Sequence, residues 1–191
     1  ADSTIAAYYA ASASLITPQA RLDLRTLESE RARLTTLLRN QGFYAFTAER
    51  IGFRVDTVGT PFRARLQLRI LQDSGSEETR RAFRRYVIDS VRVFTKYDPL
   101  RPASALATAL DSRTQDGLHY YFDKRPGIRL PVLAPLLLLR QDSLVRVSQV
   151  NRSQQNILNL GLYQTASFNF RRSSGLPRSY GSDSLKRYYP L

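Results

Sequence analysis

The stretch LLRNQGFY, residues 37–44, is echoed by ILNLGLY, residues 157–163. In both, an amphipathic helical pattern ends at a glycine, Gly42 or Gly161. An apolar residue, a tyrosine and an alternating pattern typical of a strand then follow. Glycine readily takes the positive φ that a residue just past a helix end requires. A helix–glycine–strand junction that occurs twice indicates two copies of one small module. Such duplication is more typical of proteins that bind and position partners than of enzymes.

The residues before the first junction predict two helices. An Ala-rich stretch, residues 4–14, predicts a short helix that Pro18 keeps from continuing. A longer helix follows Asp23 and Thr26, which offer capping side chains, and we expect Glu28 and Glu30 in its first turn, where the helix dipole favours acids. Its apolar face is predicted to hold Leu24, Leu27, Leu34, Leu37 and Leu38.

The residues after the first junction predict an antiparallel hairpin. Apolar residues alternate with polar or small ones over residues 50–56 and again over residues 62–70. Period 2 on both sides of a short connection predicts two paired strands with one buried face. The polar residues 72–79 then predict a linker to a second unit.

The second unit mixes strands and helices. The apolar phase changes within residues 86–94, which predicts a bulged strand, and residues 98–117 predict an irregular insertion. The remaining predicted elements are a strand at residues 118–122, a proline-initiated helix at residues 131–139, a helix marked by Val147, Val150, Ile157 and Leu158, and a strand at residues 163–170. Superposing the two units gives the order β-α-α-β-β.

The composition leaves two kinds of partner open. The chain of 191 residues has no Cys, which excludes disulfides and thiolate chemistry, and it carries 29 Lys and Arg against 16 Asp and Glu, a net charge of +13. Such a charge favours a partner with phosphates or an acidic surface. The arginines alternate with apolar residues along the predicted strands, which favours a solvated face. Because of the net charge of +13, a basic nucleic-acid-binding module is nevertheless kept as the alternative function.

The sequence carries no recognisable catalytic motif. His119 is the single histidine, so neither a metal cluster nor a Ser-His-Asp triad is supported. No phosphate-binding loop, dinucleotide fingerprint or nucleophile elbow occurs. The carboxylates Asp89, Asp98, Asp111, Asp116 and Asp123 are scattered around the predicted insertion. We expect a protein that is not an enzyme and that has no cofactor or metal.

The junction and its flanks resemble a known family. Residues 27–46, followed by the alternating residues 51–57, are similar to the helix-to-strand segment of POTRA (polypeptide-transport-associated) domains in BamA/TamA-type outer-membrane assembly factors. The similarity is greatest to the TamA-like branch of the Bacteroidota. Residues 86–93 resemble the opening strand of a following POTRA domain, and residues 130–133 and 148–163 fit its two helices.

This resemblance implies an α+β fold of tandem β-α-α-β-β modules, each a small mixed sheet covered by two helices. The first module would span residues 1–75 and lack its opening strand. The second would span residues 82–191, with an insertion at about 98–127 and a closing strand that is missing or partial. The expected function is the periplasmic part of an outer-membrane assembly or insertion protein, at the periplasmic face of a Gram-negative outer membrane.

The resemblance also implies partners and a binding edge. The expected partners are unfolded outer-membrane protein clients, a β-barrel of the same protein beyond Leu191, and periplasmic or lipoprotein accessory subunits, with a membrane surface as a further candidate and no nucleic acid. Clients would add a strand to a free sheet edge. The second strand of each module is the expected edge, at residues 49–55 and 163–170. The residues predicted to form or flank these edges are Glu49, Arg50, Ile51, Arg54, Tyr163, Thr165, Ser167 and Asn169.

Overall fold

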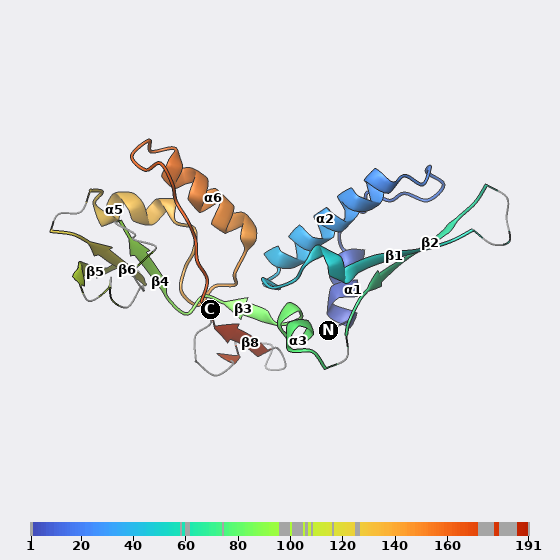
Figure 1. The fold of residues 1–191 in the computed structure, drawn as a ribbon, viewed down its shortest axis with the longest axis horizontal. Coiled ribbons are helices and arrows are strands. Elements are labelled where there is room, and N and C mark those ends of the chain that lie inside the picture. Colours follow the sequence, from blue (N-terminus) through green and yellow to red (C-terminus); the bar gives the residue numbers. More distant parts are fainter. Residues whose placement is uncertain are drawn as a thin grey trace. The chain divides into compact units, whose positions relative to one another are not determined.

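The computed structural model of the chain describes residues 2–57, 59, 62–73, 75–95, 100, 105, 107, 109–115, 117–124, 127–171, 178–179 and 187–190. It divides into two compact units, Ala1–Arg85 and Tyr86–Leu191 (Figure 1). Both units combine small sheets with helices, so the predicted α+β class is confirmed. None of the helices in the described residues is long and apolar enough to cross a membrane.

Unit 1 packs two helices on a two-stranded antiparallel sheet. Its elements are α1 (Asp2–Ala10), α2 (Leu24–Asn40), the short 3₁₀ helix η1 (Ala48–Arg50), β1 (Ile51–Asp56), β2 (Arg65–Ile70) and α3 (Glu77–Ala82). The predicted hairpin is confirmed, because β1 pairs with β2 from Ile51↔Ile70 to Asp56↔Arg65. The predicted linker at residues 72–79 is wrong, since α3 begins within it at Glu77 and unit 1 continues to Arg85.

The core of unit 1 joins the helices to one face of the hairpin. Its buried residues are Ile5, Leu34, Leu38, Phe43, Phe46, Ile51 and Ala82, and Phe53, Leu68 and Ile70 pack against them. The predicted apolar face of α2 is confirmed at Leu27, Leu34 and Leu38, whereas Leu24 is exposed. Removal of these apolar side chains from water stabilises the unit and fixes which face of the hairpin is buried.

The two ends of α2 are closed by local hydrogen bonds. Asp23 caps the start, where its carboxylate accepts from the Arg25 N–H at 3.2 Å. Glu28 and Glu30 lie beyond the first turn, which contains no acid, so their predicted place was wrong by one turn. At the other end Gly42 has φ 92°, and the Phe43 N–H returns to the Leu38 carbonyl at 3.2 Å. This is the closure that a left-handed glycine permits.

Among its described residues, unit 2 has four strands before the helix α5. Its described elements are β3 (Arg85–Val87, which begins at the last residue of unit 1), β4 (Val91–Phe94), β5 (Asp111–Gln115), β6 (Leu118–Phe122), α5 (Leu130–Leu133), η2 (Ala134–Leu136), α6 (Val147–Leu158), β7 (Arg178–Ser179) and β8 (Arg187–Pro190). The predicted bulged strand at residues 86–94 is instead two strands in different sheets, β3 and β4. The predicted irregular insertion contains β5.

One sheet of unit 2 is mixed, and its central strand carries the core. β6 lies between β4, to which it is parallel, and β5, to which it is antiparallel. Leu118, Tyr120 and Phe122 of β6 pack against Leu133 of α5 and Ile157 of α6. The predicted strand 118–122 and the helix ending at Leu158 are confirmed. The predicted helix 131–139 is shorter, because α5 and η2 together end at Leu136.

Candidate functional site

The β1–β2 hairpin has a free backbone edge along β1. The described sheet contains β1 and β2 alone, so each strand has a neighbour on one side. The Leu71 N–H donates to the Arg50 carbonyl at 2.7 Å. Hydrogen-bonded and non-hydrogen-bonded pairs alternate along an antiparallel ladder, so Gly52, Arg54 and Asp56 direct their main-chain groups to β2. Ile51, Phe53 and Val55 direct theirs to the free edge.

Two donors and three acceptors face outward on this edge. The Ile51 N–H is already used by the Ala48 carbonyl of η1. This leaves the N–H groups of Phe53 and Val55 and the carbonyls of Ile51, Phe53 and Val55. In the part of the chain that the structure describes, no backbone group outside the hairpin bonds to Phe53 or Val55. Unpaired main-chain groups in a row are the template on which an extended peptide can pair.

The side chains along β1 differ on its two faces. Ile51 is buried and Phe53 is half-buried, with the Arg31 guanidinium 5.8 Å from the centre of the Phe53 ring. Val55 is 40% exposed, and Arg54 lies exposed on the opposite face. The edge therefore combines an apolar face that continues the core with a charged face toward solvent.

The two predicted edge residues that precede β1 do not lie in a strand. Glu49 and Arg50 belong to η1, because their backbone folds into a 3₁₀ turn before the strand begins at Ile51. Arg50 binds within the unit: its guanidinium donates to the Thr79 hydroxyl at 3.0 Å and lies 6.0 Å from the centre of the Phe83 ring. Arg50 thus links the start of β1 to α3 through this hydrogen bond. Hydrogen bonds from its own backbone N–H and from Thr47 lower the pKa of the exposed Glu49.

The second predicted edge, residues 163–170, forms no strand. None of these residues is assigned to a strand, so the predicted strand is wrong. Tyr163, Ala166 and Phe168 pack against the core of unit 2, and the Gln154 amide donates to the Ala166 carbonyl at 2.6 Å. Burial raises the pKa of Tyr163. Thr165, Ser167 and Asn169 are exposed, as the alternating pattern predicts, but they lie on no sheet edge.

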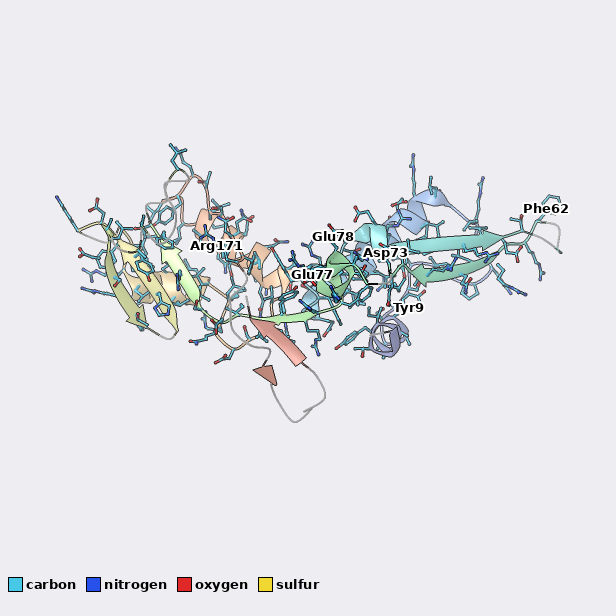
Figure 2. All side chains as sticks on the ribbon, turned by 60° about the horizontal axis from the view of Figure 1, so that its bottom comes forward. Tyr9, Phe62, Asp73, Glu77, Glu78 and Arg171 are labelled. Carbon is cyan, nitrogen blue, oxygen red and sulfur yellow. The ribbon has the colours of Figure 1, made fainter. Side chains whose placement is uncertain are left out.

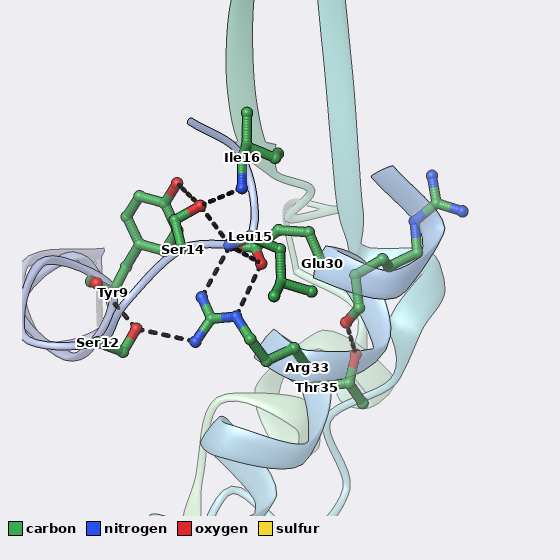
Figure 3. A network of polar contacts seen from close by, with 9 residues as sticks. Tyr9, Ser12, Ser14, Leu15, Ile16, Glu30, Arg33 and Thr35 are labelled. Carbon is green, nitrogen blue, oxygen red and sulfur yellow. Dashed lines mark hydrogen bonds and ion pairs between the residues drawn. The ribbon is translucent and has the colours of Figure 1, made fainter. Parts of the chain in front are cut away.

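A buried ion pair supports the helix that backs the hairpin (Figure 3). Glu30 of α2 is fully buried, and Arg33 donates to both of its carboxylate oxygens at 2.7 Å. The Ser14 hydroxyl and the Leu15 N–H also donate to Glu30, at 2.9 and 3.0 Å. The pKa of Glu30 is lowered, chiefly by the bond from Arg33. The sequence did not predict this network. Glu30 stands among the apolar residues of α2, and two of its partners, at residues 14 and 15, lie in a loop outside the helix.

Aromatic residues on the sheet of unit 2 bear on the nucleic-acid alternative. Phe94 and Tyr121 lie on adjacent strands, and their rings stack on each other with centres 4.7 Å apart. Nucleic-acid readers present ring faces for bases to stack on. Here one face of each ring is covered by the other ring, so that face is not available to stack on a base. His119, on the same side of β6, shares a hydrogen bond of 3.1 Å with the Thr114 hydroxyl.

A groove in unit 2 and the acids of the described residues form no reactive cluster. The groove, of about 400 Å³, is lined by Gln115, Leu118, Pro131, Ala134, Pro135 and Arg140. The Arg140 guanidinium is engaged by the carbonyls of Ala134, Leu137 and Leu139. Among the described residues, no three His, Asp or Glu side chains gather as a metal site would require.

Comparison with known proteins gives a distant structural likeness. The chain is similar to the crystal structure of Haemophilus influenzae BamA POTRA3-5, with a TM-score of 0.48 and 10% sequence identity. The similarity covers 99% of this chain and 54% of that one, so the chain spans about half the length of that structure. No protein-family model and no curated protein matches the sequence.

Proposed function

We propose that this chain is a peptide-binding part of an outer-membrane assembly protein, and that β1 receives extended clients by strand addition. The observation that carries the proposal is the outward row of main-chain groups on β1: the N–H groups of Phe53 and Val55 and the carbonyls of Ile51, Phe53 and Val55 have no backbone partner in the described chain. The sequence resemblance of residues 27–57 to POTRA modules of BamA/TamA-type proteins supports the same function. It adds a location at the periplasmic face of the outer membrane.

A client strand would complete the sheet as a third strand beside β1. Each backbone hydrogen bond contributes about 0.5–1.5 kcal/mol net, so five bonds give a weak and reversible complex. Main-chain bonding makes little demand on the client's sequence. An assembly factor that hands on many different unfolded chains needs this combination of low affinity and low selectivity.

The side chains of β1 favour a client with alternating apolar residues. Phe53 and Val55 present apolar surface on one face of the edge, and Arg54 presents a charge on the other. Cross-strand neighbours on one face of a sheet contact each other directly. Strands of outer-membrane barrels alternate apolar and polar residues over about ten positions, which fits these two faces.

One other edge, on the mixed sheet of unit 2, is less suited to this role. β5 is also an edge strand, but all five of its residues are exposed and polar: Asp111, Ser112, Arg113, Thr114 and Gln115. Charged and polar edge strands are typical of edges that resist pairing. An attached β-barrel, accessory subunits and the TamA-like branch are part of the same proposal and rest on the sequence resemblance alone.

The test compares two proline variants at facing positions. Val55 and Leu66 are directly opposite in the hairpin, and both direct their main-chain groups outward, on opposite edges. We expect Val55→Pro to abolish photo-crosslinking of a ten-residue peptide of alternating valine and threonine, because it removes the outward N–H and places a ring on the edge. Leu66→Pro should leave the crosslinking intact.

Circular dichroism of both variants must first show the parent fold. With that satisfied, undiminished crosslinking to Val55→Pro contradicts β1 as the receiving edge. Loss of crosslinking in Leu66→Pro alone would move the site to β2.

A further inference from the structure

The tip of the β1–β2 hairpin carries an exposed aromatic residue in a strained backbone conformation. Phe62 is 108% exposed, at the tip of the hairpin (Figure 2), and its φ is 60°. A bulky side chain rarely takes this left-handed conformation. Both features cost free energy in the isolated unit. Backbone strain of this kind tends to cluster at functional sites.

The chain around Phe62 is uncharged on one side and basic on the other. Residues 57–62, TVGTPF, contain no charge, and Arg63 and Arg65 follow at once. The register places Arg54, Arg65 and Arg69 on one face of the hairpin, with Asp56 as the one acid of that face. Arg54, Arg63, Arg65 and Arg69 are all exposed.

The apolar face of the hairpin becomes more exposed toward the tip. Arg31 of α2 lies over Phe53, whereas Val55, two residues closer to the tip, is 40% exposed. Val55 and its neighbour Leu66 lie between the core and Phe62. In Figure 1 this distal half of the hairpin extends away from α1. The hairpin therefore ends in apolar side chains beside a basic face.

We propose that this tip docks on an anionic phospholipid surface. Phe62 inserts at the boundary between headgroups and acyl chains, where aromatic side chains are stabilised. Arg63 and Arg65, which follow Phe62 closely, then lie near the depth of the lipid phosphates, and Arg54 extends the same basic face further from the membrane. Anionic lipid is the occupant that matches the positive charge of the tip, and an apolar residue backed by basic ones is the usual composition of an interfacial anchor. This inference does not depend on strand addition at β1.

A single tryptophan tests the insertion directly. The chain contains no Trp, so Phe62→Trp makes residue 62 its one tryptophan. With vesicles of phosphatidylglycerol and phosphatidylcholine, we expect a blue shift of the emission and quenching by lipids brominated near the headgroup. The matched control is Leu162→Trp, at an apolar position that is 67% exposed in unit 2, and it should show neither change.

A second pair of variants tests the charge. Arg63→Gln should weaken binding to the anionic vesicles about fivefold, as expected for one basic residue near such a surface. Arg92→Gln, an exposed arginine on β4, should leave the binding unchanged. Equal quenching at positions 62 and 162 would show general adhesion of a basic protein and would overturn the proposal. Absence of any shift at position 62 on anionic vesicles would overturn it too.

Discussion

The strand β1 and the segment 163–170 follow the same kind of junction but adopt different structures. Both come after an amphipathic helix and a glycine of positive φ, 92° at Gly42 and 68° at Gly161. After Gly42, Phe43 is 3% exposed and belongs to the core of unit 1. After Gly161, Leu162 is 67% exposed. The first junction leads into a paired strand and the second into a segment that is not assigned to a strand.

The difference shows that an alternating pattern specifies a buried face but not a hydrogen-bonded partner. β1 has β2 immediately after it in the chain, and hairpin pairing requires little loop closure. In unit 2 the described sheet has the order β4-β6-β5, with β4 and β5 at its edges. The segment 163–170 keeps its alternating burial by packing on the core and pairs with no strand.

The largest expected effect concerns the support of β1. Glu30→Ala should destabilise unit 1 by about 3–5 kcal/mol, because it leaves Arg33 without its buried partner. Glu28→Ala is the matched control: it removes another i,i+3 pair with an arginine, but Glu28 is exposed, and the cost should stay below about 1 kcal/mol. Denaturant unfolding followed by hydrogen exchange of unit 1 peptides measures both. Equal effects would contradict the structural role of the Glu30 network.

The same carboxylate gives unit 1 an acid limit. Because Arg33 lowers the pKa of Glu30 below its ordinary value of 4.5, the stabilisation is complete above that value. It is lost as the pH falls through the lower pKa of the folded state. In Glu30→Gln this part of the acid dependence should be absent, and a parent-like decline below pH 4.5 would contradict it.

The sequence predicted the local elements better than their pairing. The ends of α2 and α6 before their glycines, the hairpin and the strand 118–122 could be predicted, because each depends on capping residues or on periodicity within a few positions. The absence of a strand at 163–170 and the division of residues 86–94 between two sheets could not be predicted, because both depend on pairing between strands that are far apart in the sequence. At the site, Ile51 and Arg54 were placed in β1 correctly, whereas Arg50 was missed as a link to Thr79 on α3.

A pair of proline variants tests the difference between β1, which is paired, and residues 163–170, which are not part of a strand. Arg54→Pro should destabilise unit 1 by about 1–3 kcal/mol, because the Arg54 N–H faces β2 and its loss leaves a carbonyl of the ladder without a partner. Ser167→Pro should cost less than about 1 kcal/mol in unit 2, since residue 167 has no ladder. Thermal unfolding by circular dichroism distinguishes them. An equal or larger loss in Ser167→Pro would indicate that residues 163–170 pair after all.

The smallest expected effect concerns β6, the central strand of the mixed sheet in unit 2. Tyr120 of β6 donates to the Ile128 carbonyl at 2.6 Å, and burial raises its pKa to about 12. Tyr120→Phe should cost about 1 kcal/mol, since it removes that bond, whereas Tyr121→Phe removes a hydroxyl from the more exposed face of β6 and should be nearly neutral.

The raised pKa of Tyr120 also sets an alkaline limit for unit 2. The folded state favours the neutral phenol, so its stability is present below pH 10 and falls as the pH rises toward 12. Unit 2 should lose stability in this range, and Tyr120→Phe should lose less. Identical alkaline profiles for the two proteins would contradict a role for the Tyr120 hydroxyl.

The most direct test of the receiving edge is amide hydrogen exchange of the whole chain with and without the alternating peptide. If β1 accepts the peptide as a third strand, the N–H groups of Phe53 and Val55 become protected on binding. Those of Gly52 and Arg54, which already face β2, should change little, and those of Thr165 and Ser167 should not change. Peptide binding that leaves Phe53 and Val55 unprotected, or that protects residues 163–170 instead, would contradict the account.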